Sequence, residues 1–537
     1  MNQTIQKEVQ RRRTFAIISH PDAGKTTMTE KLLLYGGAIR EAGSVKARKA
    51  SRHATSDWME IEKQRGISVT SSIMQFEYEG YCVNILDTPG HQDFSEDTYR
   101  TLCAADAAVM LIDGARGVEP QTIKLFHVCR MRGIPIFTFI NKMDRASLPP
   151  FDLLDQLEKV LGIDSCPVNW PIGTDGDLKG VYNRRQQVIQ RFTAGGDHGA
   201  KQVDIQVTSV DDPALSELIG NSYHEKLQED IELLDIAGDN FDQARILRGE
   251  LTPVFFGSAI TNFGVEPFLQ DFLKMSPCPG PQKMADGDEI SPVAEAFSAF
   301  VFKIQANMNP GHRDRMAFLR ICSGQFTKGL EVTNSRDGKP VRLNQPQTFM
   351  AQDHRVLEEA YAGDIIGIFD PGQLRIGDSL YSGKKRLEFG DIPRFAPEHF
   401  ASIAPVNSLK RKQFNKGMVQ LAQEGAVQLY KRPDSGTETY VVGAVGVLQF
   451  DVLEHRLNNE YGVDIRVEHL NYRLARWLTS DHLPAEEIAQ EDLNLTSTTL
   501  LVLDRDNRPV LLFESPWAMD WALDRNEGLH LADINQN

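Results

Sequence analysis

The chain has 537 residues, which corresponds to three or four domains at roughly 150 residues per domain. It is 41% hydrophobic and 25% charged, and its glycines and prolines follow no three-residue period, so fibrous, collagen-like and wholly disordered classes are excluded. The net charge of −16 at pH 7 repels nucleic acid, so any RNA contact must come from local basic patches.

Neither a membrane span nor a cysteine framework is predicted. The longest apolar runs, such as Ala107–Ile112, are far shorter than the ~18 residues that a membrane helix needs. The six cysteines include no CxxC pair, which argues against a zinc site or a disulfide framework and favours a reducing compartment. No targeting segment is recognised, and we expect a cytoplasmic protein without a membrane partner.

Residues 14–145 alternate apolar runs with helical stretches. This pattern predicts a parallel α/β sheet with helices on both faces. The expected strands are Thr14–Ser19, Tyr81–Asp87, Ala107–Asp113 and Ile134–Asn141, and the expected helices are Gly24–Tyr35 and Gln121–Arg132.

The pattern becomes less regular after Asp144 and then returns to the α/β type. A strand is predicted at Thr252–Gly257 and a helix at Val265–Met275. A βαβ unit needs only about 30 residues, so we expect a subdomain inserted over about 146–250. Its predicted helices are Phe151–Leu161 and His224–Ala237, and the whole domain is expected to cover 1–280.

Two further domains are predicted beyond the proline-rich linker at 276–281. Short β-rich runs with glycine turns over 288–386 indicate a β-barrel. Over 387–537, predicted helices such as Gln413–Gln423 and Val447–Glu460 mix with strands such as Thr439–Val445 and Asp464–His469, which indicates an α+β domain.

A candidate phosphate-binding loop joins the first predicted strand to the first helix. Its residues are Ser19, His20, Pro21, Asp22, Ala23, Gly24, Lys25 and Thr26. Backbone N–H groups of such a loop bind phosphate, Lys25 would lie along the β- and γ-phosphates, and the Thr26 hydroxyl would ligate Mg²⁺. Ser19 stands where the P-loop pattern has glycine, and a chance Gly-Lys-Thr is the alternative.

A second motif ends the strand Tyr81–Asp87. Its residues are Asp87, Thr88, Pro89, Gly90 and His91. The Asp87 carboxylate can hold Mg²⁺ through water, and the Gly90 N–H can approach a γ-phosphate because glycine has no Cβ. An ordinary turn is the alternative interpretation.

A third motif, Asn141, Lys142, Met143 and Asp144, also follows a predicted strand. Asp144 can accept hydrogen bonds from N1–H and the 2-amino group of guanine, which adenine lacks. Lys142 would lie against the base, and Asn141 would tie this loop to the phosphate loop. The tripeptide Gly257, Ser258 and Ala259 fits a loop that offers a backbone N–H to guanine O6.

These motifs, each at the carboxyl end of a strand, resemble the P-loop GTPases. Arg65-Gly66-Ile67-Ser68 is similar to a motif of the translational GTPases, and this resemblance implies that Ser68 replaces a threonine that ligates Mg²⁺. It also implies that His91 positions the attacking water and that Asp22 holds a monovalent cation. The cofactors so implied are GTP/GDP and Mg²⁺.

The domain order and Gly446–Phe450 resemble the first three domains of elongation factor G, but only 67 residues follow Leu470. Together with the motifs, this length resembles the bacterial family of peptide chain release factor three. The resemblance implies a ribosome-dependent, monomeric GTPase that removes codon-reading release factors from the ribosome after peptide release. Another translational GTPase of the elongation factor G group is the alternative.

Two basic patches are candidates for contact with ribosomal RNA. They are Lys46, Arg48, Lys49, Arg52 and His53, and Lys410, Arg411, Lys412 and Lys416. A solvated charged face is the alternative for each. A GTP-consuming metabolic enzyme would need a second catalytic set, which we do not find, and a binding module without hydrolysis is disfavoured by Asp87, His91 and Ser68.

Overall fold

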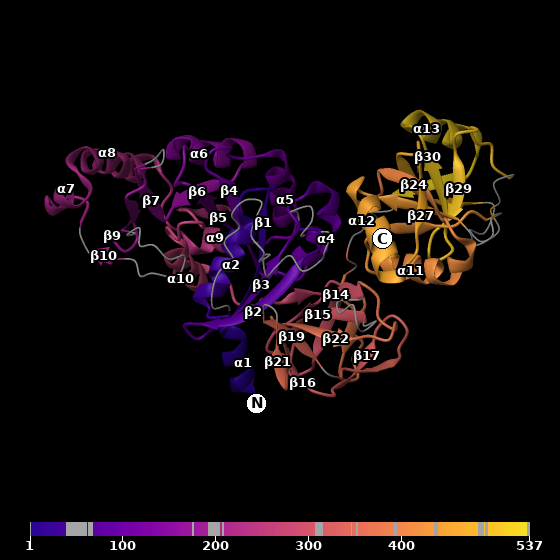
Figure 1. Cartoon of the computed structure of the whole chain (residues 1–537). Coiled ribbons are helices and arrows are strands. Elements are labelled where there is room, and N and C mark those ends of the chain that lie inside the picture. The colour runs from indigo at the N-terminus through magenta and orange to yellow at the C-terminus, as the bar shows by residue number, and fades with distance from the viewer. Residues whose placement is uncertain are drawn as a thin grey trace.

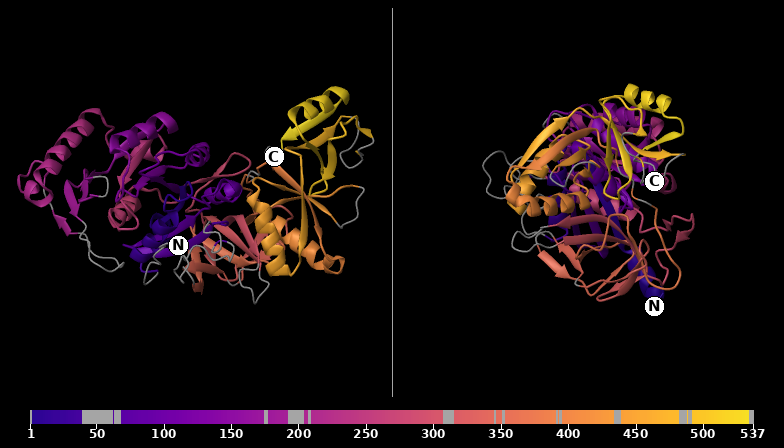
Figure 2. Two further views of the ribbon diagram at one scale, coloured as in Figure 1. Left: turned by 45° about the horizontal axis from the view of Figure 1, so that its top comes forward. Right: turned by 90° about the vertical axis from the view of Figure 1, so that its right-hand side faces the viewer.

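The computed structural model describes residues 2–38, 62, 68–173, 177–191, 204–206, 209–306, 315–344, 346–350, 353–390, 392, 395–433, 439–481, 488 and 492–533. They form an α/β domain, a β-rich domain beside it and a C-terminal domain (Figure 1). The helices α7 and α8 and the C-terminal domain lie at opposite ends of the molecule (Figure 2). In the described part of the chain, no helix is both long and apolar enough to cross a membrane.

The α/β domain is built on a seven-stranded sheet of order β2-β3-β1-β4-β5-β11-β6 among the described residues. Every residue of β1, β4, β5 and β11 is buried, as expected for strands covered on both faces. All pairs are parallel except β2 with β3, so the predicted parallel sheet is confirmed. The bounds are β1 Arg12–Ser19, β2 Ser72–Tyr78, β3 Tyr81–Asp87, β4 Ala107–Asp113, β5 Ile136–Asn141, β6 Asp164–Pro167 and β11 Leu251–Phe256.

Strand β2 is an addition to the predicted sheet. It pairs with β3 through a two-residue turn, Glu79-Gly80, in which both residues have positive φ, 46° and 83°. Such turns match the right-handed twist of paired strands. The hairpin therefore adds one antiparallel strand at the edge of a parallel sheet.

Helices cover both faces of this sheet, as predicted. Leu32 of α2 and Phe268 of α10 pack in one apolar cluster, and Phe126 of α5 and Leu153 of α6 pack in another. A π-helical turn, Leu157–Leu161, continues α6. The bounds are α1 Asn2–Gln10, α2 Lys25–Tyr35, η1 Gln92–Phe94, α4 Ser95–Leu102, α5 Pro120–Met131, α6 Pro150–Gln156 and α10 Val265–Met275.

A second, antiparallel sheet of order β10-β9-β8-β7 lies between β6 and β11 in the chain. Strand β6 falls within the range predicted as inserted, yet it pairs in parallel with β11 in the main sheet. The bounds are β7 Asn169–Ile172, β8 Gly180–Asn183, β9 Val188–Arg191, β10 Asp204–Gln206, α7 Ala214–Ile219, α8 Asn221–Ala237 and α9 Gln243–Leu247.

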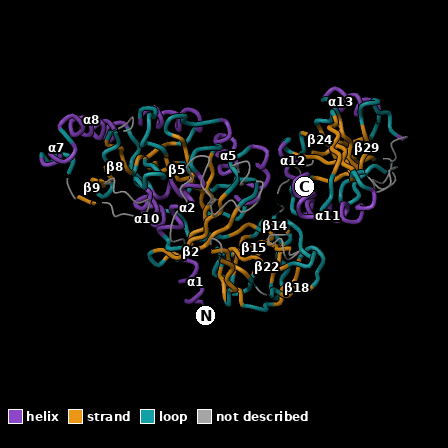
Figure 3. The backbone as a smooth tube through the Cα atoms, viewed as in Figure 1, coloured by secondary structure: helices purple, strands orange, loops and turns teal. Residues whose placement is uncertain are grey.

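Strands dominate the second domain (Figure 3). Its main sheet has the order β18-β17-β23-β14-β15-β22-β19-β20, and β16 pairs with β21. The bounds are β12 Gln282–Lys283, β13 Glu289–Ile290, β14 Ser298–Ala306, β15 Arg315–Ser323, β16 Gln325–Thr327, β17 Glu331–Asn334, β18 Pro340–Arg342, β19 Gln347–Met350, β20 Asp353–Val356, β21 Glu359–Tyr361, β22 Ile365–Phe369 and β23 Ser379–Tyr381.

The C-terminal domain contains two four-stranded antiparallel sheets where the sequence predicts one α+β unit. Their orders are β25-β26-β24-β27 and β29-β30-β28-β31. Phe400 and Tyr430 of the first sheet pack with Trp477 and Val510 of the second, so the two share a core. The bounds are β24 His399–Pro405, η3 Ser408–Lys410, α11 Arg411–Gln423, β25 Gln428–Tyr430, β26 Tyr440–Ala444, α12 Leu448–Tyr461, β27 Ile465–Leu470, β28 Leu474–Ser480, β29 Leu500–Leu503, β30 Pro509–Phe513, α13 Pro516–Arg525 and β31 Leu529–Asp533.

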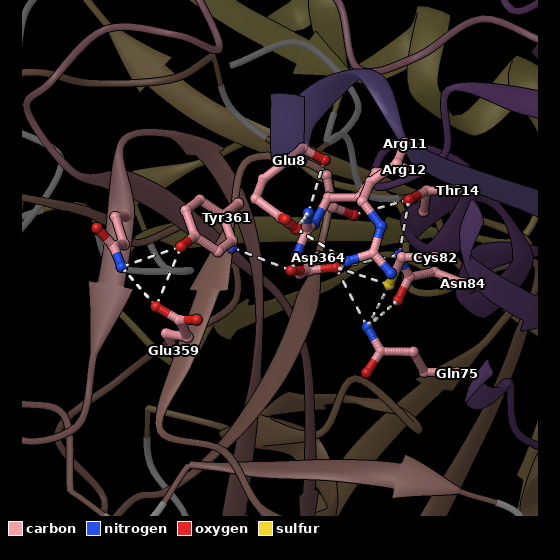
Figure 4. A network of polar contacts seen from close by, with 12 residues as sticks. Glu8, Arg11, Arg12, Thr14, Gln75, Cys82, Asn84, Glu359, Tyr361 and Asp364 are labelled. Atoms are coloured by element: carbon pink, nitrogen blue, oxygen red, sulfur yellow. Dashed lines mark hydrogen bonds and ion pairs between the residues drawn. The ribbon is translucent and has the colours of Figure 1, made fainter. Parts of the chain in front are cut away.

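A buried polar network joins the α/β domain to the β-rich domain (Figure 4). Arg12 Nε donates to Asp364 Oδ2 at 2.7 Å, and both side chains are almost inaccessible. Thr14 Oγ1 donates to Gly363 O at 2.7 Å, and the Arg12 guanidinium lies 4.7 Å from the centre of the Tyr361 ring. The start of β1 is therefore fixed directly against β21 and the turn that follows it.

Candidate functional site

The candidate phosphate loop is the turn between β1 and α2. Asp22 and Gly24 have positive φ, 66° and 95°. A Cβ on Gly24 would collide with Asn141 Nδ2, so both backbone conformation and space require glycine there. Ser19 is not among the described residues with positive φ, and its Oγ donates to His20 O at 2.9 Å. The serine in place of glycine therefore costs this backbone nothing.

His20 lies buried inside the same turn. Its Nε2 is 2.9 Å from Glu119 Oε2. Burial lowers the pKa of His20 and outweighs the opposing effect of the Glu119 carboxylate. The imidazole is therefore neutral at pH 7.

Lys25 and Asp87 are paired at the start of α2 and the end of β3. Lys25 Nζ donates to Asp87 Oδ1, and both side chains are buried. Thr26 follows on the same helix and is half-buried. The structure thus brings together the predicted phosphate-binding cation and the carboxylate predicted to hold Mg²⁺ through water.

Asn141 ties the three loops of the site together. Its Nδ2 donates to Ala23 O at 2.8 Å, and its Oδ1 accepts from Ala259 N at 2.8 Å. Met143 N also donates to Gly257 O at 3.1 Å. The amide of Asn141 therefore links the ends of β1, β5 and β11 at the carboxyl edge of the sheet, where open α/β sheets bind ligands.

Lys142 has a positive φ of 68°, and Asp113 orients its side chain. Lys142 Nζ donates to Asp113 Oδ2 at 2.8 Å and to Asp22 O. Burial alone would raise the pKa of Asp113, but hydrogen bonds from Lys142 and from the Ala115 N–H lower it. Asp113 belongs to none of the predicted motifs, although its place at the end of the apolar run Ala107–Asp113 is the same signal that marks Asp87.

Asp144 provides the clearest indication of a ligand. Its Oδ1 is buried and has no hydrogen-bond partner among the described residues. Its Oδ2 lies 3.8 Å from Arg145 Nε. A buried acceptor without a donor costs about 1–3 kcal/mol, so this oxygen fits the N–H edge of a bound base.

The tripeptide Gly257–Ala259, which follows β11, is hydrogen-bonded to Asn141 and Met143 at the end of β5. Gly257 N donates to Ile140 O at 3.0 Å, Ser258 N donates to Phe263 O at 2.9 Å, and Ala259 N is bonded to Asn141. All three N–H groups are used within the protein. Contact of one of these N–H groups with guanine O6, as the sequence predicts, would require that group to exchange its bond within the protein for a bond to the base.

The segment Thr88–His91 lies against the phosphate loop. Thr88 Oγ1 donates to Ile17 O at 2.8 Å. A Cβ built on Gly90 would lie 3.5 Å from the Pro21 backbone, so the two loops are in close contact. His91 caps η1, its ring is 30% exposed, and its Nδ1 accepts from Asp93 N at 3.2 Å. The same Nδ1 lies 3.2 Å from Asp93 Oδ1, so both the backbone and the carboxylate of Asp93 face this ring nitrogen.

Of the remaining predicted residues, Ser68 and the second basic patch lie among the described residues, and the others lie outside them. Ser68 is half-buried, and the N–H groups of Val69 and Thr70 beside it donate to Glu62 Oε1 at 2.9 and 3.1 Å. Outside the described residues lie Lys46, Arg48, Lys49, Arg52, His53, Arg65, Gly66 and Ile67. In the second basic patch, Lys412 and Lys416 are exposed and Lys410 and Arg411 are half-buried.

Three family models match successive parts of the chain. The Elongation factor Tu GTP binding domain matches residues 10–278, Elongation factor G domain 2 matches residues 296–383, and the Class II release factor RF3, C-terminal domain, matches residues 389–523. A solved structure from Thermus thermophilus has a TM-score of 0.68 at 22% identity, and it covers 92% of this chain and 73% of that one. This last likeness shows the fold.

Full-length relatives are more similar. Peptide chain release factor 3 of Symbiobacterium thermophilum is 57% identical over 526 residues, with 98% of each chain covered. The protein of the same name from Listeria monocytogenes is 53% identical over 538 residues, which cover 99% of this chain and all of the relative. The release-factor C-terminal domain also disfavours another member of the elongation factor G group. This chain therefore belongs to the peptide chain release factor 3 family, the GTP-hydrolysing translation factors of termination.

Proposed function

We propose that this GTPase promotes dissociation of codon-reading release factors from the ribosome after peptide release. The observation that carries the proposal is a direct contact between helix α4, which follows the His91 segment, and the C-terminal domain. Arg100 Nη1 and Nη2 donate to Glu424 O at 3.1 Å and to Gly425 O at 2.9 Å. A change in the nucleotide-facing loops would therefore be transmitted to the domain that marks the release-factor family.

The nucleotide would be held by the carboxyl-edge loops. Asp144 accepts from the guanine edge, Lys142 covers the base, and the phosphate loop with Lys25 binds the phosphates. The proposed nucleotide-binding residues are Ser19, His20, Pro21, Asp22, Ala23, Gly24, Lys25, Thr26, Asp87, Thr88, Pro89, Gly90, His91, Asn141, Lys142, Met143, Asp144, Gly257, Ser258 and Ala259.

Mg²⁺ fits the same site, because the oxygens of Thr26, Ser68 and Asp87 are the hard donors that this ion prefers. We assign Thr26 and Ser68 as ligands and Asp87 as a holder through water. Bound Mg²⁺ supplies neutralisation of charge on the β- and γ-phosphates. In the structure, the Asp87 carboxylate is paired with Lys25 Nζ, so the carboxylate lies beside the proposed phosphate-binding cation.

His91 would orient the attacking water, and the ribosome would accelerate the step. No matched motif assigns an arginine to the transferred phosphoryl group. Intrinsic GTPases without such an arginine turn over at about 10⁻⁴ s⁻¹, and an activator in trans gains roughly 10³- to 10⁵-fold. Substituting His91→Ala should keep GTP binding and lose most of the ribosome-stimulated turnover. Single-turnover hydrolysis with saturating ribosomes measures this.

The proposed partners are ribosomal RNA and proteins and the codon-reading release factors, with the chain acting as a cytoplasmic monomer. Lys410, Arg411, Lys412 and Lys416 lie together on η3 and α11, and beside them Leu409 is 91% exposed. A basic cluster of this kind suits phosphate contact in an acidic protein.

A purified termination reaction tests the function. Ribosomes are first treated with a limiting codon-reading release factor, and multiple rounds of peptide release are then followed with this protein and GTP. We expect GTP to raise the number of rounds, and we expect this protein alone to release no peptide, since its sequence has no Gly-Gly-Gln. Peptide release by this protein alone, or no gain in rounds, would overturn the proposal.

A further inference from the structure

The turn that carries His91 is held from its far side by the C-terminal domain. Asp93 is the second residue of the 3₁₀ turn η1, and its backbone N–H is the donor to His91 Nδ1. Its carboxylate Oδ2 accepts from the backbone N–H of Leu448 at 2.8 Å. Leu448 is the first residue of helix α12, so a side chain of the GTPase domain caps a helix of another domain.

Where Asp93 of the GTPase domain meets Gly446 of the C-terminal domain, there is no space for an additional side-chain atom. A Cβ built on Gly446 would collide with the Asp93 side chain. Gln449 Oε1 accepts from Val445 N at 2.7 Å and from Gly446 N at 3.1 Å, which shapes the turn that presents Gly446. Asp93 itself is only 7% exposed, so solvent competes little for its carboxylate.

Apolar contacts fix the same turn beside the polar one. Phe94, the next residue, packs with Val69 and with Val452 and Leu448 of α12. Val69 directly follows Ser68. One end of α12 therefore contacts both the His91 turn and the segment that carries the proposed Ser68 ligand.

We propose that Asp93 is a positioning residue for GTP hydrolysis. Its bond to the N-terminus of α12 fixes the turn whose backbone N–H holds the His91 ring, so docking of the C-terminal domain sets the orientation of His91. A displacement of the C-terminal domain then changes the hydrolysis rate without changing any nucleotide contact. The inference rests on the proposed role of His91.

The test weakens this contact from each domain in turn, using the full-length protein. Asp93→Ala removes the acceptor of the Leu448 N–H and also the carboxylate oxygen that lies 3.2 Å from His91 Nδ1. Gly446→Ala adds a methyl group that collides with Asp93 but keeps its carboxylate, so it tests the contact between the domains alone. We expect each variant to lower single-turnover hydrolysis on saturating ribosomes by about 10- to 100-fold, the cost of misplacing a reacting group by about 1 Å. The Kd for GTP should stay within about twofold of the wild type, because neither residue belongs to the nucleotide loops.

Three further variants and one exchange measurement separate positioning from general damage. Asp93→Asn keeps an acceptor oxygen and should retain most of the rate, and Gly390→Ala should match the wild type because a Cβ there meets no atom within 4 Å. The double variant Asp93→Ala/Gly446→Ala should lose no more than the worse single variant, since both break one contact. Amide hydrogen exchange of residues 91–94 should be faster in Gly446→Ala.

The outcomes distinguish the inference from the function on which it rests. Wild-type hydrolysis by both Asp93→Ala and Gly446→Ala overturns the inference, even where His91→Ala is inactive. A loss of GTP affinity equal to the loss of rate also overturns it. Wild-type hydrolysis by His91→Ala instead overturns the proposed role of His91 itself.

Discussion

Asp144 keeps one carboxylate oxygen buried and without a donor among the described residues, in the loop that follows strand β5. We predict that Asp144→Asn weakens GDP binding roughly 5- to 150-fold, because an unpaired group at a buried hydrogen-bonding site costs about 1–3 kcal/mol. The same variant should gain affinity for xanthosine diphosphate, whose C2 oxygen accepts from the new amide. Titration of both nucleotides against wild type and variant measures this exchange.

The matched control is Asp155→Asn, at an exposed carboxylate paired with Lys159. It should leave both affinities unchanged, because exposed ion pairs contribute about 0–1 kcal/mol and this one lies outside the proposed site. Equal affinity of Asp144→Asn for guanosine diphosphate, relative to the wild type, would remove Asp144 from the base site.

Some residues of the site could be predicted from the sequence and others could not. The motif residues Lys25, Asp87 and Asn141 were predictable because their spacing follows strands and turns of the local chain. Asp113 also ends an apolar strand but belongs to none of the recognised motifs, and the partner of Asp93, Leu448, lies in another domain, 355 positions away. Such pairs depend on the packing of separate elements, which local spacing does not encode.

At the scale of elements, one side chain joins three loops. Asn141 holds Ala23 of the phosphate loop and Ala259 of the loop after β11, and all of these groups are buried. We predict that Asn141→Ala destabilises the GTPase domain by about 2–6 kcal/mol, since it leaves a buried carbonyl and a buried N–H unsatisfied at about 1–3 kcal/mol each. Its affinity for GDP should fall as well. Thermal unfolding with and without GDP measures both effects.

Asn459→Ala serves as the control for this substitution. Asn459 is exposed and bonds only its helix neighbour His455 in the described structure, so its loss should change stability by at most about 0.5 kcal/mol. If Asn141→Ala unfolds at the temperature of the wild type, Asn141 does not carry the link between the loops.

Strands that are buried on both faces are easier to predict from sequence than strands that are partly exposed. Strands β1, β4 and β5 are continuous apolar runs because both of their faces are covered, and their sequence pattern predicts them well. Strand β2 mixes buried and partly exposed residues, and it exists because the Glu79-Gly80 turn folds it onto β3. The second sheet of the C-terminal domain is defined by pairings such as β28 with β31, which single-strand patterns do not specify.

At the scale of the whole molecule, the C-terminal domain meets the β-rich domain at a buried ion pair. Arg456 Nη1 donates to Glu424 Oε2 at 2.6 Å, and Arg456 Nε donates to Glu460 Oε1 at 2.6 Å. Glu424 Oε1 also accepts from Ala306 N at 3.1 Å, at the end of β14. Because Arg100 bonds the Glu424 and Gly425 carbonyls, all three domains converge on this segment.

Removing the cation should therefore have an effect that depends on pH. We predict that Arg456→Met destabilises the protein by about 3–5 kcal/mol near neutral pH, since it leaves Glu424 as an unpaired buried charge. Burial already raises the pKa of Glu424 with Arg456 beside it, and loss of the cation raises that pKa further. The folded variant then retains a proton that the unfolded chain releases, so its stability falls as pH rises through the usual carboxylate range.

Arg456→Met should accordingly lose more stability relative to the wild type at pH 8 than at pH 5, where a protonated Glu424 needs no cation. Thermal unfolding at the two pH values measures the difference. Arg386→Met is the matched control, because Arg386 and its partner Glu388 are exposed and such pairs contribute about 0–1 kcal/mol. A loss in Arg456→Met that is the same at both pH values would mean that Glu424 stays ionised, and that water or another group, rather than Arg456, compensates its charge where the three domains meet.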